Sequence, residues 1–132
     1  MAIKQVDKGT FSTWANQQLA SGDTIRSMAP TGRFILETDP AQSRNLIAFA
    51  AGSGITPILS QIKEVLLKEP SSVFTLFYVN RDTPSIIFRE ALQELKDAYL
   101  ERFRLFHILT REPQDIEPVS YTHLTLPTIL RV

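Results

Sequence analysis

Residues 51–57 read Ala51-Gly52-Ser53-Gly54-Ile55-Thr56-Pro57, and this stretch decides the predicted fold. It ends the continuous apolar run Leu46–Ala51, which is typical of a strand buried on both faces of a parallel sheet. Thr56 is expected to cap a helix whose first residue is Pro57, because a missing N–H costs nothing at that position. A lone Gly-x-Gly would indicate only a tight turn. The strand before it and the Thr-Pro start after it favour a phosphate site at the amide-rich start of a helix.

Downstream of this stretch, apolar runs alternate with amphipathic ones. Helices are expected from Thr56 to just before Pro70 and from Ile86 to about Arg102. Strands are expected over Val73–Val79 and Arg104–Leu109. This alternation predicts an α/β fold in which a Rossmann-like β-α-β-α-β unit forms half of a parallel sheet with right-handed crossovers.

The first 39 residues have a different texture, with short extended segments interrupted by Gly and Pro. Strands are expected over residues 3–6, 24–28 and 34–37, and a short helix over 12–19 with Ser12 or Thr13 as its cap. This pattern predicts the end of a β-barrel. The polar stretch 39–45 is interpreted as a linker, so the expected organisation is 1–39, 40–117 and a tail, 118–132.

Two arginines follow the second and third predicted strands. Arg81 comes after one and Arg111 after the other, so both are expected at the sheet edge that carries the glycine-rich turn. A guanidinium there can hold a 2′-phosphate through two hydrogen bonds or stack on adenine. The alternative is that both are solvated loop arginines, and the sequence alone leaves this open.

Composition excludes several classes of function. Fourteen Lys and Arg balance fourteen Asp and Glu, so no overall field attracts nucleic acid or an anionic membrane surface. The chain is 43% hydrophobic, has no cysteine and contains no apolar run of membrane-spanning length. His107 and His123 have no ligand cluster around them, so neither a metal site nor a catalytic residue is predicted. The default expectation is a cytoplasmic protein.

Several motifs in order resemble the ferredoxin–NADP reductase superfamily over about residues 3–117. The segments that carry the resemblance are Gly9-Thr10-Phe11-Ser12, residues 29–34, residues 50–57, residues 76–81 and Thr110-Arg111-Glu112. Within that superfamily, residues 77–81 and 108–115 are most similar to oxygenase reductases of the phenylacetyl-coenzyme A epoxidase type. A sequence of ordered motifs is far more specific than one glycine-rich turn.

The resemblance implies a flavoprotein oxidoreductase that carries electrons from NADPH, or NADH, through FAD to a [2Fe–2S] centre and an oxygenase or ferredoxin-type acceptor. The first 39 residues would then be the end of the flavin-binding barrel, and residues 40–117 part of the NAD(P)-binding domain. The cofactor-binding residues that it implies are Gly9, Phe11, Ser12, Gly52, Ser53, Gly54, Ile55, Thr56, Pro57, Asn80, Arg81, Thr110 and Arg111.

The same resemblance predicts an incomplete protein. The family's Arg-x-Tyr-Ser/Thr flavin motif, the last strands of its nucleotide domain and its Cys-rich cluster domain are not in this sequence, and residues 118–132 look like translated adapter DNA. The chain by itself is therefore expected to be inactive. Three alternatives stay open: a flavin reductase without an iron–sulfur partner, a non-catalytic nucleotide-binding module, and a flavodoxin-like α/β protein.

Overall fold

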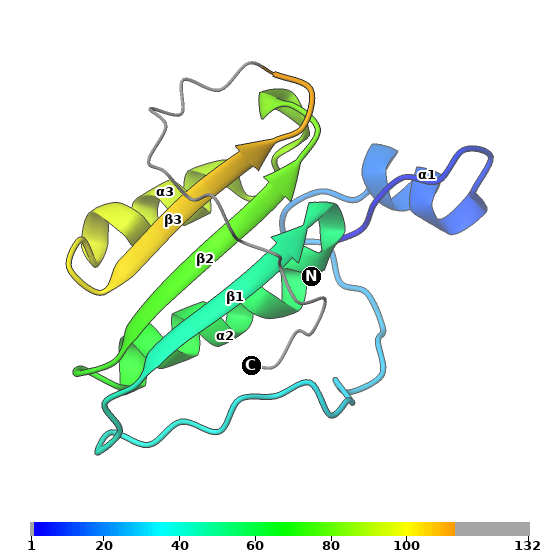
Figure 1. The fold of residues 1–132 in the computed structure, drawn as a ribbon. Helices are drawn as coiled ribbons and strands as arrows, with labels where there is room; N and C mark the ends of the chain where they lie inside the picture. The colour runs from blue at the N-terminus through cyan, green and yellow to red at the C-terminus, as the bar shows by residue number, and fades with distance from the viewer. Residues whose placement is uncertain (1, 113–132) are drawn as a thin grey trace. The chain divides into compact units, whose positions relative to one another are not determined.

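The computed structural model describes residues 2–112, and its largest feature is a parallel three-stranded sheet in the order β1-β2-β3 (Figure 1). The strands are β1, Asn45–Ala51, β2, Val73–Asn80, and β3, Phe103–Leu109. All three pair in parallel, with Ala51 opposite Val79 and Leu109 opposite Asn80, so their carboxyl ends meet at one edge of the sheet. The predicted α/β arrangement is confirmed, with each strand within one residue of its expected bounds. Residues 113–132, which include the predicted tail, lie outside the described residues.

Two helices cover one face of this sheet, behind it in Figure 1. Helix α2, Ile55–Lys68, connects β1 to β2, and helix α3, Arg89–Ala98, connects β2 to β3. The apolar stripe predicted for α2 is confirmed, because its members are buried against the alternate residues of the strands. The fully buried members of this core are Ile55, Ile62, Val65, Phe74, Leu76, Tyr78 and Leu92.

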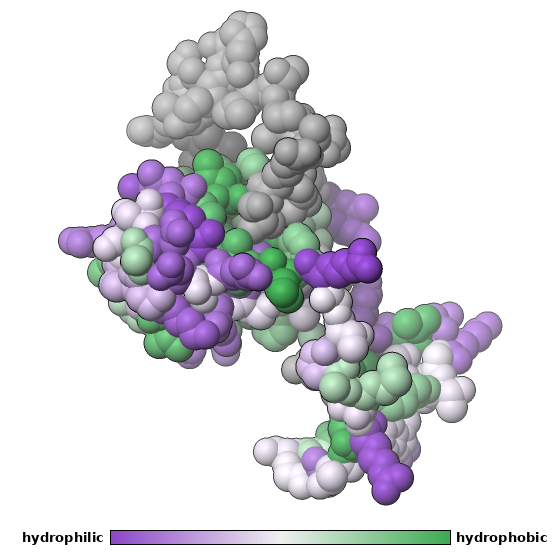
Figure 2. All heavy atoms as spheres, turned by 90° about the horizontal axis from the view of Figure 1, so that it is seen from below, coloured by the Kyte–Doolittle hydropathy of each residue, from purple (hydrophilic) through white to green (hydrophobic). Residues whose placement is uncertain are grey.

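The opposite face of the sheet carries apolar side chains that no described helix covers. Phe49, Phe77 and Phe106 stack across the three strands, with ring centroids 5.1 Å apart in each pair. Phe106 is 49% exposed, and Ile47 on the edge strand β1 is 54% exposed. Figure 2 shows hydrophobic side chains that reach the molecular surface between hydrophilic ones. Parallel sheets usually have both faces covered, so this face is unusual for its class.

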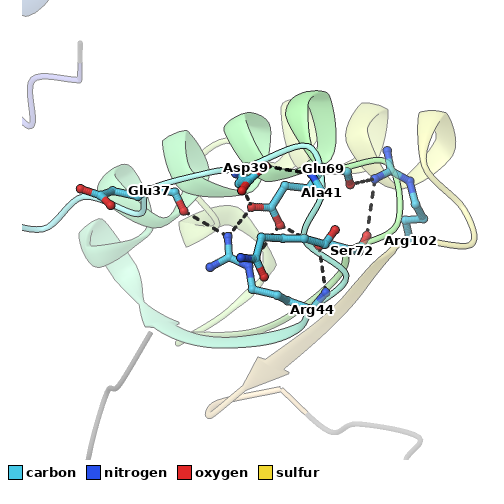
Figure 3. Close-up of polar contacts among 8 residues, drawn as sticks. Glu37, Asp39, Ala41, Arg44, Glu69, Ser72 and Arg102 are labelled. Carbon is cyan, nitrogen blue, oxygen red and sulfur yellow. Dashed lines mark hydrogen bonds and ion pairs between the residues drawn. The ribbon is translucent and has the colours of Figure 1, made fainter.

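The amino edge of the sheet is tied together by a buried ion pair (Figure 3). Arg44, Ser72 and Arg102 each immediately precede one of the three strands, and all three contact Glu69. The carboxylate of Glu69 is fully buried and accepts hydrogen bonds from the Arg44 guanidinium, from Ser72 Oγ at 2.7 Å and from the Asp39 N–H at 3.2 Å. Arg102 caps the end of α2 by donating to the main-chain carbonyl of Glu69.

The surroundings of Glu69 act on its pKa in opposite directions. Burial alone would raise the pKa of this carboxyl, but the hydrogen bonds from Arg44, Ser72 and the Asp39 amide, together with the charge of Arg44, bring the pKa below its usual value of 4.5. Glu69 is therefore ionised at neutral pH and keeps residues 37–44 against the start of the sheet.

The chain divides into two compact units, the first ending at Arg33 and the second starting at Phe34. The first unit contains one helix, α1, Thr10–Gln17, where a helix over 12–19 was expected. Gly9, and not Ser12 or Thr13, occupies the cap position. The strands expected over residues 3–6, 24–28 and 34–37 are wrong: these segments have no regular secondary structure and pair with no strand among residues 2–112. Extended backbone becomes a strand only when it forms a hydrogen-bonded ladder.

Helix α3 is shorter than the predicted span 86–102. Asp82 caps a 3₁₀ turn, Thr83–Ser85, and Phe88 then adopts a left-handed conformation with φ of 59°. A left-handed residue breaks the right-handed helix, so α3 starts at Arg89. Leu92 is nevertheless buried on the expected stripe, with Leu95 and Tyr99 packed against the core. No helix among residues 2–112 is long and apolar enough to cross a bilayer.

Candidate functional site at the carboxyl edge of the sheet

The glycine-rich turn lies at the carboxyl end of β1 and leads directly into α2. Gly52–Gly54 form a 3₁₀ turn, in which Gly52 has φ of +49°, a conformation that residues with a Cβ adopt at a cost. A Cβ built on Gly52 or Gly54 would meet no atom within 4 Å. The space over both glycines is therefore open, and a ligand can approach the backbone closely there.

Helix α2 begins two residues earlier than expected. Ile55 is its first residue and Gly54 its cap, so the prediction that Thr56 caps the helix is wrong. The Thr56 hydroxyl donates backward to the carbonyl of Ser53 at 2.8 Å, because the preceding 3₁₀ turn has already curled the chain. Pro57 is third in the helix rather than first, but it still lies in the first turn, where N–H groups have no intrahelical acceptor.

The side chain of Tyr78 on β2 reaches the turn from the helix-covered face of the sheet. Its hydroxyl donates to the carbonyl of Gly52 at 2.9 Å and lies 3.4 Å from that of Ile87. Burial raises the pKa of the Tyr78 phenol, against the smaller opposing effects of the Ile87 carbonyl and the Asn80 amide. The phenol is therefore a protonated donor at neutral pH. The role of this residue could not be predicted from the sequence, because only the sheet register places Tyr78 next to the end of β1.

Arg81 and Arg111 lie side by side, one just after β2 and the other just after β3, at the same edge of the sheet. The N–H of Thr110 donates to the carbonyl of Asn80 at 3.0 Å, and that of Arg111 to the carbonyl of Arg81 at 2.9 Å. These two bonds extend the β2–β3 pairing past the last residue of each strand. Both arginines are exposed to solvent. The structure thus brings the two predicted arginines to the edge that holds the glycine-rich turn.

Glu112 fixes the loop after β3 to the loop after β2. Its carboxylate accepts from the main-chain N–H of Thr83 at 2.7 Å and from the Thr83 hydroxyl at 2.8 Å. Both carboxylate oxygens are used in this contact, so the acidic group beside Arg111 faces Thr83. Sequence analysis quoted Glu112 as part of a motif but did not assign it a role. No spacing rule would have paired it with a residue 29 positions earlier.

Asn80, the last residue of β2, is 6% exposed and its side chain turns into the helix-covered face. Its buried amide interacts with the Tyr78 hydroxyl, whose pKa this contact lowers. Asn80, which the resemblance predicts as a cofactor contact, is therefore buried beside Tyr78, whereas Arg81, the next residue, is exposed.

The remaining predicted site residues, Gly9, Phe11 and Ser12, lie at the start of α1 in the first unit. A Cβ on Gly9 would meet Ser12 Oγ at 2.5 Å and the carbonyl of Val6 at 3.1 Å, so local packing favours glycine there. Ser12 Oγ accepts from the Val6 N–H at 3.0 Å, which closes the turn before the helix. Phe11 is 60% exposed and tilts against Trp14, with ring centroids 5.7 Å apart.

No titratable cluster accompanies this edge. Among residues 2–112, no group of three or more His, Cys, Asp and Glu side chains is arranged to hold a metal ion. His107 on β3 is half-buried, and burial, with the charges of Arg89 and Lys96, lowers its pKa. His107 is thus neutral at pH 7 and lies beside the Tyr78 ring, 5.9 Å between centroids.

Comparison with known proteins identifies the class of protein to which the chain belongs. Residues 48–122, more than half of the chain, match the family model of the oxidoreductase NAD-binding domain. The chain is 41% identical to a 1,2-phenylacetyl-CoA epoxidase subunit from Escherichia coli, over 87% of this chain and 32% of that protein. It is 35% identical to the ferredoxin reductase component of 3-ketosteroid-9-alpha-monooxygenase from Rhodococcus rhodochrous, over 83% and 30%.

Solved structures share the fold. An Amycolatopsis cytochrome P450 reductase superposes with a TM-score of 0.65 at 24% identity, covering 86% of this chain and 34% of that one. The cytochrome b5 reductase domain of Ulva prolifera nitrate reductase gives 0.64 at 22% identity, covering 83% and 44%.

These matches define an NAD-binding domain of the oxidoreductase class. The chain belongs to the family of oxidoreductase NAD-binding domains, and the resemblance of its motifs to the ferredoxin–NADP reductase superfamily is confirmed. It spans about a third of the length of the curated relatives that it matches.

Proposed function

We propose that the chain binds NADPH at the carboxyl edge of its sheet, as the nucleotide-binding part of a reductase that passes electrons through FAD to an oxygenase or a ferredoxin-type acceptor. One observation carries this proposal. The open Gly52–Gly54 turn and the exposed arginines Arg81 and Arg111 lie at the same edge. The names of the relatives, an epoxidase subunit and a monooxygenase reductase component, support an oxygenase as the acceptor.

The diphosphate of the nucleotide is assigned to the turn. The first turn of α2 lies at the positive end of the helix dipole, and the α-helical pattern leaves the N–H of Thr56 there without an acceptor, whereas the N–H of Ile55 already donates to the carbonyl of Gly52. A Cβ on Gly54 would point into free space, so an anion can come within hydrogen-bond distance of the backbone. Ser53 adds an exposed hydroxyl beside these amides.

The 2′-phosphate is assigned to Arg81 and Arg111. Two guanidinium groups on adjacent loops can surround a dianion, and each can offer two parallel N–H donors. Thr110, exposed beside Arg111, adds a hydroxyl. Glu112 would repel a phosphate if it pointed outward, but Thr83 takes both its oxygens. This charge arrangement favours NADPH over NADH.

The flavin diphosphate is assigned to the first turn of α1, where Gly9 and Ser12 form a tight start and Phe11 is exposed enough to contact a cofactor. When both groups are bound, the nicotinamide supplies a hydride and the flavin accepts it. The residues of this chain bind and align the cofactors. The sequence has no cysteine, so none of its residues ligates a cysteine-bound [2Fe–2S] cluster.

The arginine assignment is tested by titrating the chain with NADPH and NADH in a calorimeter. Arg81→Ala or Arg111→Ala is expected to weaken NADPH binding by about tenfold or more, as charged hydrogen bonds are worth ~1.5–3 kcal/mol, and to leave NADH binding nearly unchanged. Arg104→Ala is the matched control, since Arg104 is an exposed arginine near the amino end of β3. Equal losses for both nucleotides, or the same loss in the Arg104 variant, would contradict the assignment.

A further inference from the structure

The Gly52–Ser53 peptide is held by a side chain that lies outside the predicted motif. The carbonyl of Gly52 accepts two hydrogen bonds, one from the buried Tyr78 hydroxyl at 2.9 Å and one from the N–H of Ile55. Tyr78 itself is fully buried in the core, paired in register with Ala50 of β1. Its ring cannot turn away without displacing packed neighbours, so the hydroxyl is a fixed donor.

The orientation of that peptide decides which way an amide faces. The structure has no cis peptide among the described residues, and in a planar trans peptide the N–H points opposite to the C=O of the same unit. With the Gly52 carbonyl turned inward to Tyr78, the N–H of Ser53 must point away from the core. Ser53 and Gly54 are exposed while Gly52 is half-buried, so this N–H faces the open side of the turn.

Gly52 alone would not fix this orientation. Glycine with φ of +49° has other accessible conformations of similar energy, because no Cβ restricts its backbone. A rotation of the peptide would send the carbonyl, with its partial negative charge, toward the position assigned to the diphosphate. The bond from Tyr78 opposes that rotation.

We propose that Tyr78 is a positioning residue for nucleotide binding: its hydroxyl holds the Gly52–Ser53 peptide so that the Ser53 N–H faces the diphosphate. This inference rests on the proposed function and deepens it. Tyr78 does not touch the nucleotide. It acts through the carbonyl of Gly52. Arg81 and Arg111 are assigned to the 2′-phosphate, which is a different part of the nucleotide from the diphosphate.

The test compares Tyr78→Phe with Tyr99→Phe in the full 132-residue chain. Tyr99 follows α3 and contacts Arg102 instead of the turn, so its variant is a matched loss of one phenol oxygen. Tyr78→Phe is expected to weaken NADPH binding about fivefold, as for one neutral hydrogen bond, and to leave binding of adenosine 2′-monophosphate within about twofold. That ligand has the 2′-phosphate but no diphosphate, so a general loss of fold would weaken both ligands alike.

A second measurement needs no nucleotide. Hydrogen exchange of the Ile55 amide, which shares the Gly52 carbonyl with Tyr78, is expected to accelerate in Tyr78→Phe, while that of Ile62 in the middle of α2 stays constant. Unchanged NADPH affinity together with unchanged exchange at Ile55 would overturn the role of Tyr78 and leave the proposed function standing. An unaltered chain that binds neither NADPH nor adenosine 2′-monophosphate would overturn the proposed function itself.

Discussion

Two buried polar residues fix the opposite edges of the same sheet. Tyr78 holds the turn at the carboxyl edge, and Glu69 joins the residues that precede all three strands at the amino edge. Neither side chain is exposed. A buried charge is tolerated only when it is paired and hydrogen-bonded, and Glu69 has a guanidinium, a hydroxyl and a main-chain amide around it. The conformation of the sheet that carries the site therefore depends also on contacts at its opposite, amino edge.

Replacing Glu69 tests how much these amino-edge contacts contribute to the free energy of unfolding. Glu69→Gln leaves Arg44 without its counter-charge, and since Arg44 is partly exposed, the loss is expected to be about 2–3 kcal/mol, below the ~3–5 for a fully buried pair. Urea unfolding measures it. Glu64→Gln is the control, because Glu64 is in an exposed pair with Lys68 whose contribution is about 0.5 kcal/mol. Equal effects of the two substitutions would contradict the role given to Glu69.

The same residue gives the stability a pH dependence. Because hydrogen bonding and the Arg44 charge outweigh burial, the folded pKa of Glu69 lies below the usual 4.5. The stabilisation is therefore complete above about pH 4.5 and is lost as the pH falls through the lower, folded pKa. In Glu69→Gln this part of the acid dependence is expected to disappear.

At the scale of elements, the sequence was sufficient where the pattern is local and repeated. Apolar runs predicted β1, β2 and β3, and the helical stripe predicted α2, because burial on a parallel sheet demands these periodicities. The bond from Tyr78 to Gly52 could not be predicted, since it depends on strand register. The start of α3 was wrong because the left-handed Phe88 has no sequence signal. The strands before residue 39 were wrong because strand formation depends on a partner.

The two glycines of the turn are expected to respond differently to alanine. Gly52→Ala forces a Cβ into left-handed backbone and should cost ~1–2 kcal/mol. Gly54 has helical φ of −63°, so Gly54→Ala should keep or raise stability, by up to about 1 kcal/mol. Both Cβ positions are open, so packing contacts contribute to the change in stability of neither variant. Thermal unfolding measures which of the two variants is the less stable. NADPH titration is a separate test, and Gly54→Ala should bind more weakly despite the intact fold. Unweakened binding would argue against close approach of a ligand at Gly54.

At the scale of the whole molecule, the helices among residues 2–112 cover one face of the sheet and not the other, and β1 is an edge strand of this three-stranded sheet. Stacked phenylalanines and an exposed Ile47 lie on the uncovered face. Apolar edge strands with free N–H and C=O groups promote association between chains. Residues 2–112 therefore combine a well-packed carboxyl edge with an apolar surface that favours self-association.

Ile47→Lys is expected to raise the soluble, monomeric fraction of the purified chain, because a charge on an edge strand opposes strand pairing. Light scattering after gel filtration measures this fraction. Leu67→Lys is the matched control, since Leu67 is 73% exposed on α2, away from the sheet face. The same gain from both variants would show that net charge is the cause and that the edge strand is not.

The most direct test of the account is to map NADPH on the ¹⁵N-labelled chain by nuclear magnetic resonance. The account predicts that the largest shifts on titration occur at the amides of Gly52, Ser53, Gly54 and Ile55, with a second group at Arg81 and Arg111. Saturating shifts confined to residues at the amino edge, around Arg44 and Ser72, or no shifts at the glycine-rich turn, would contradict it.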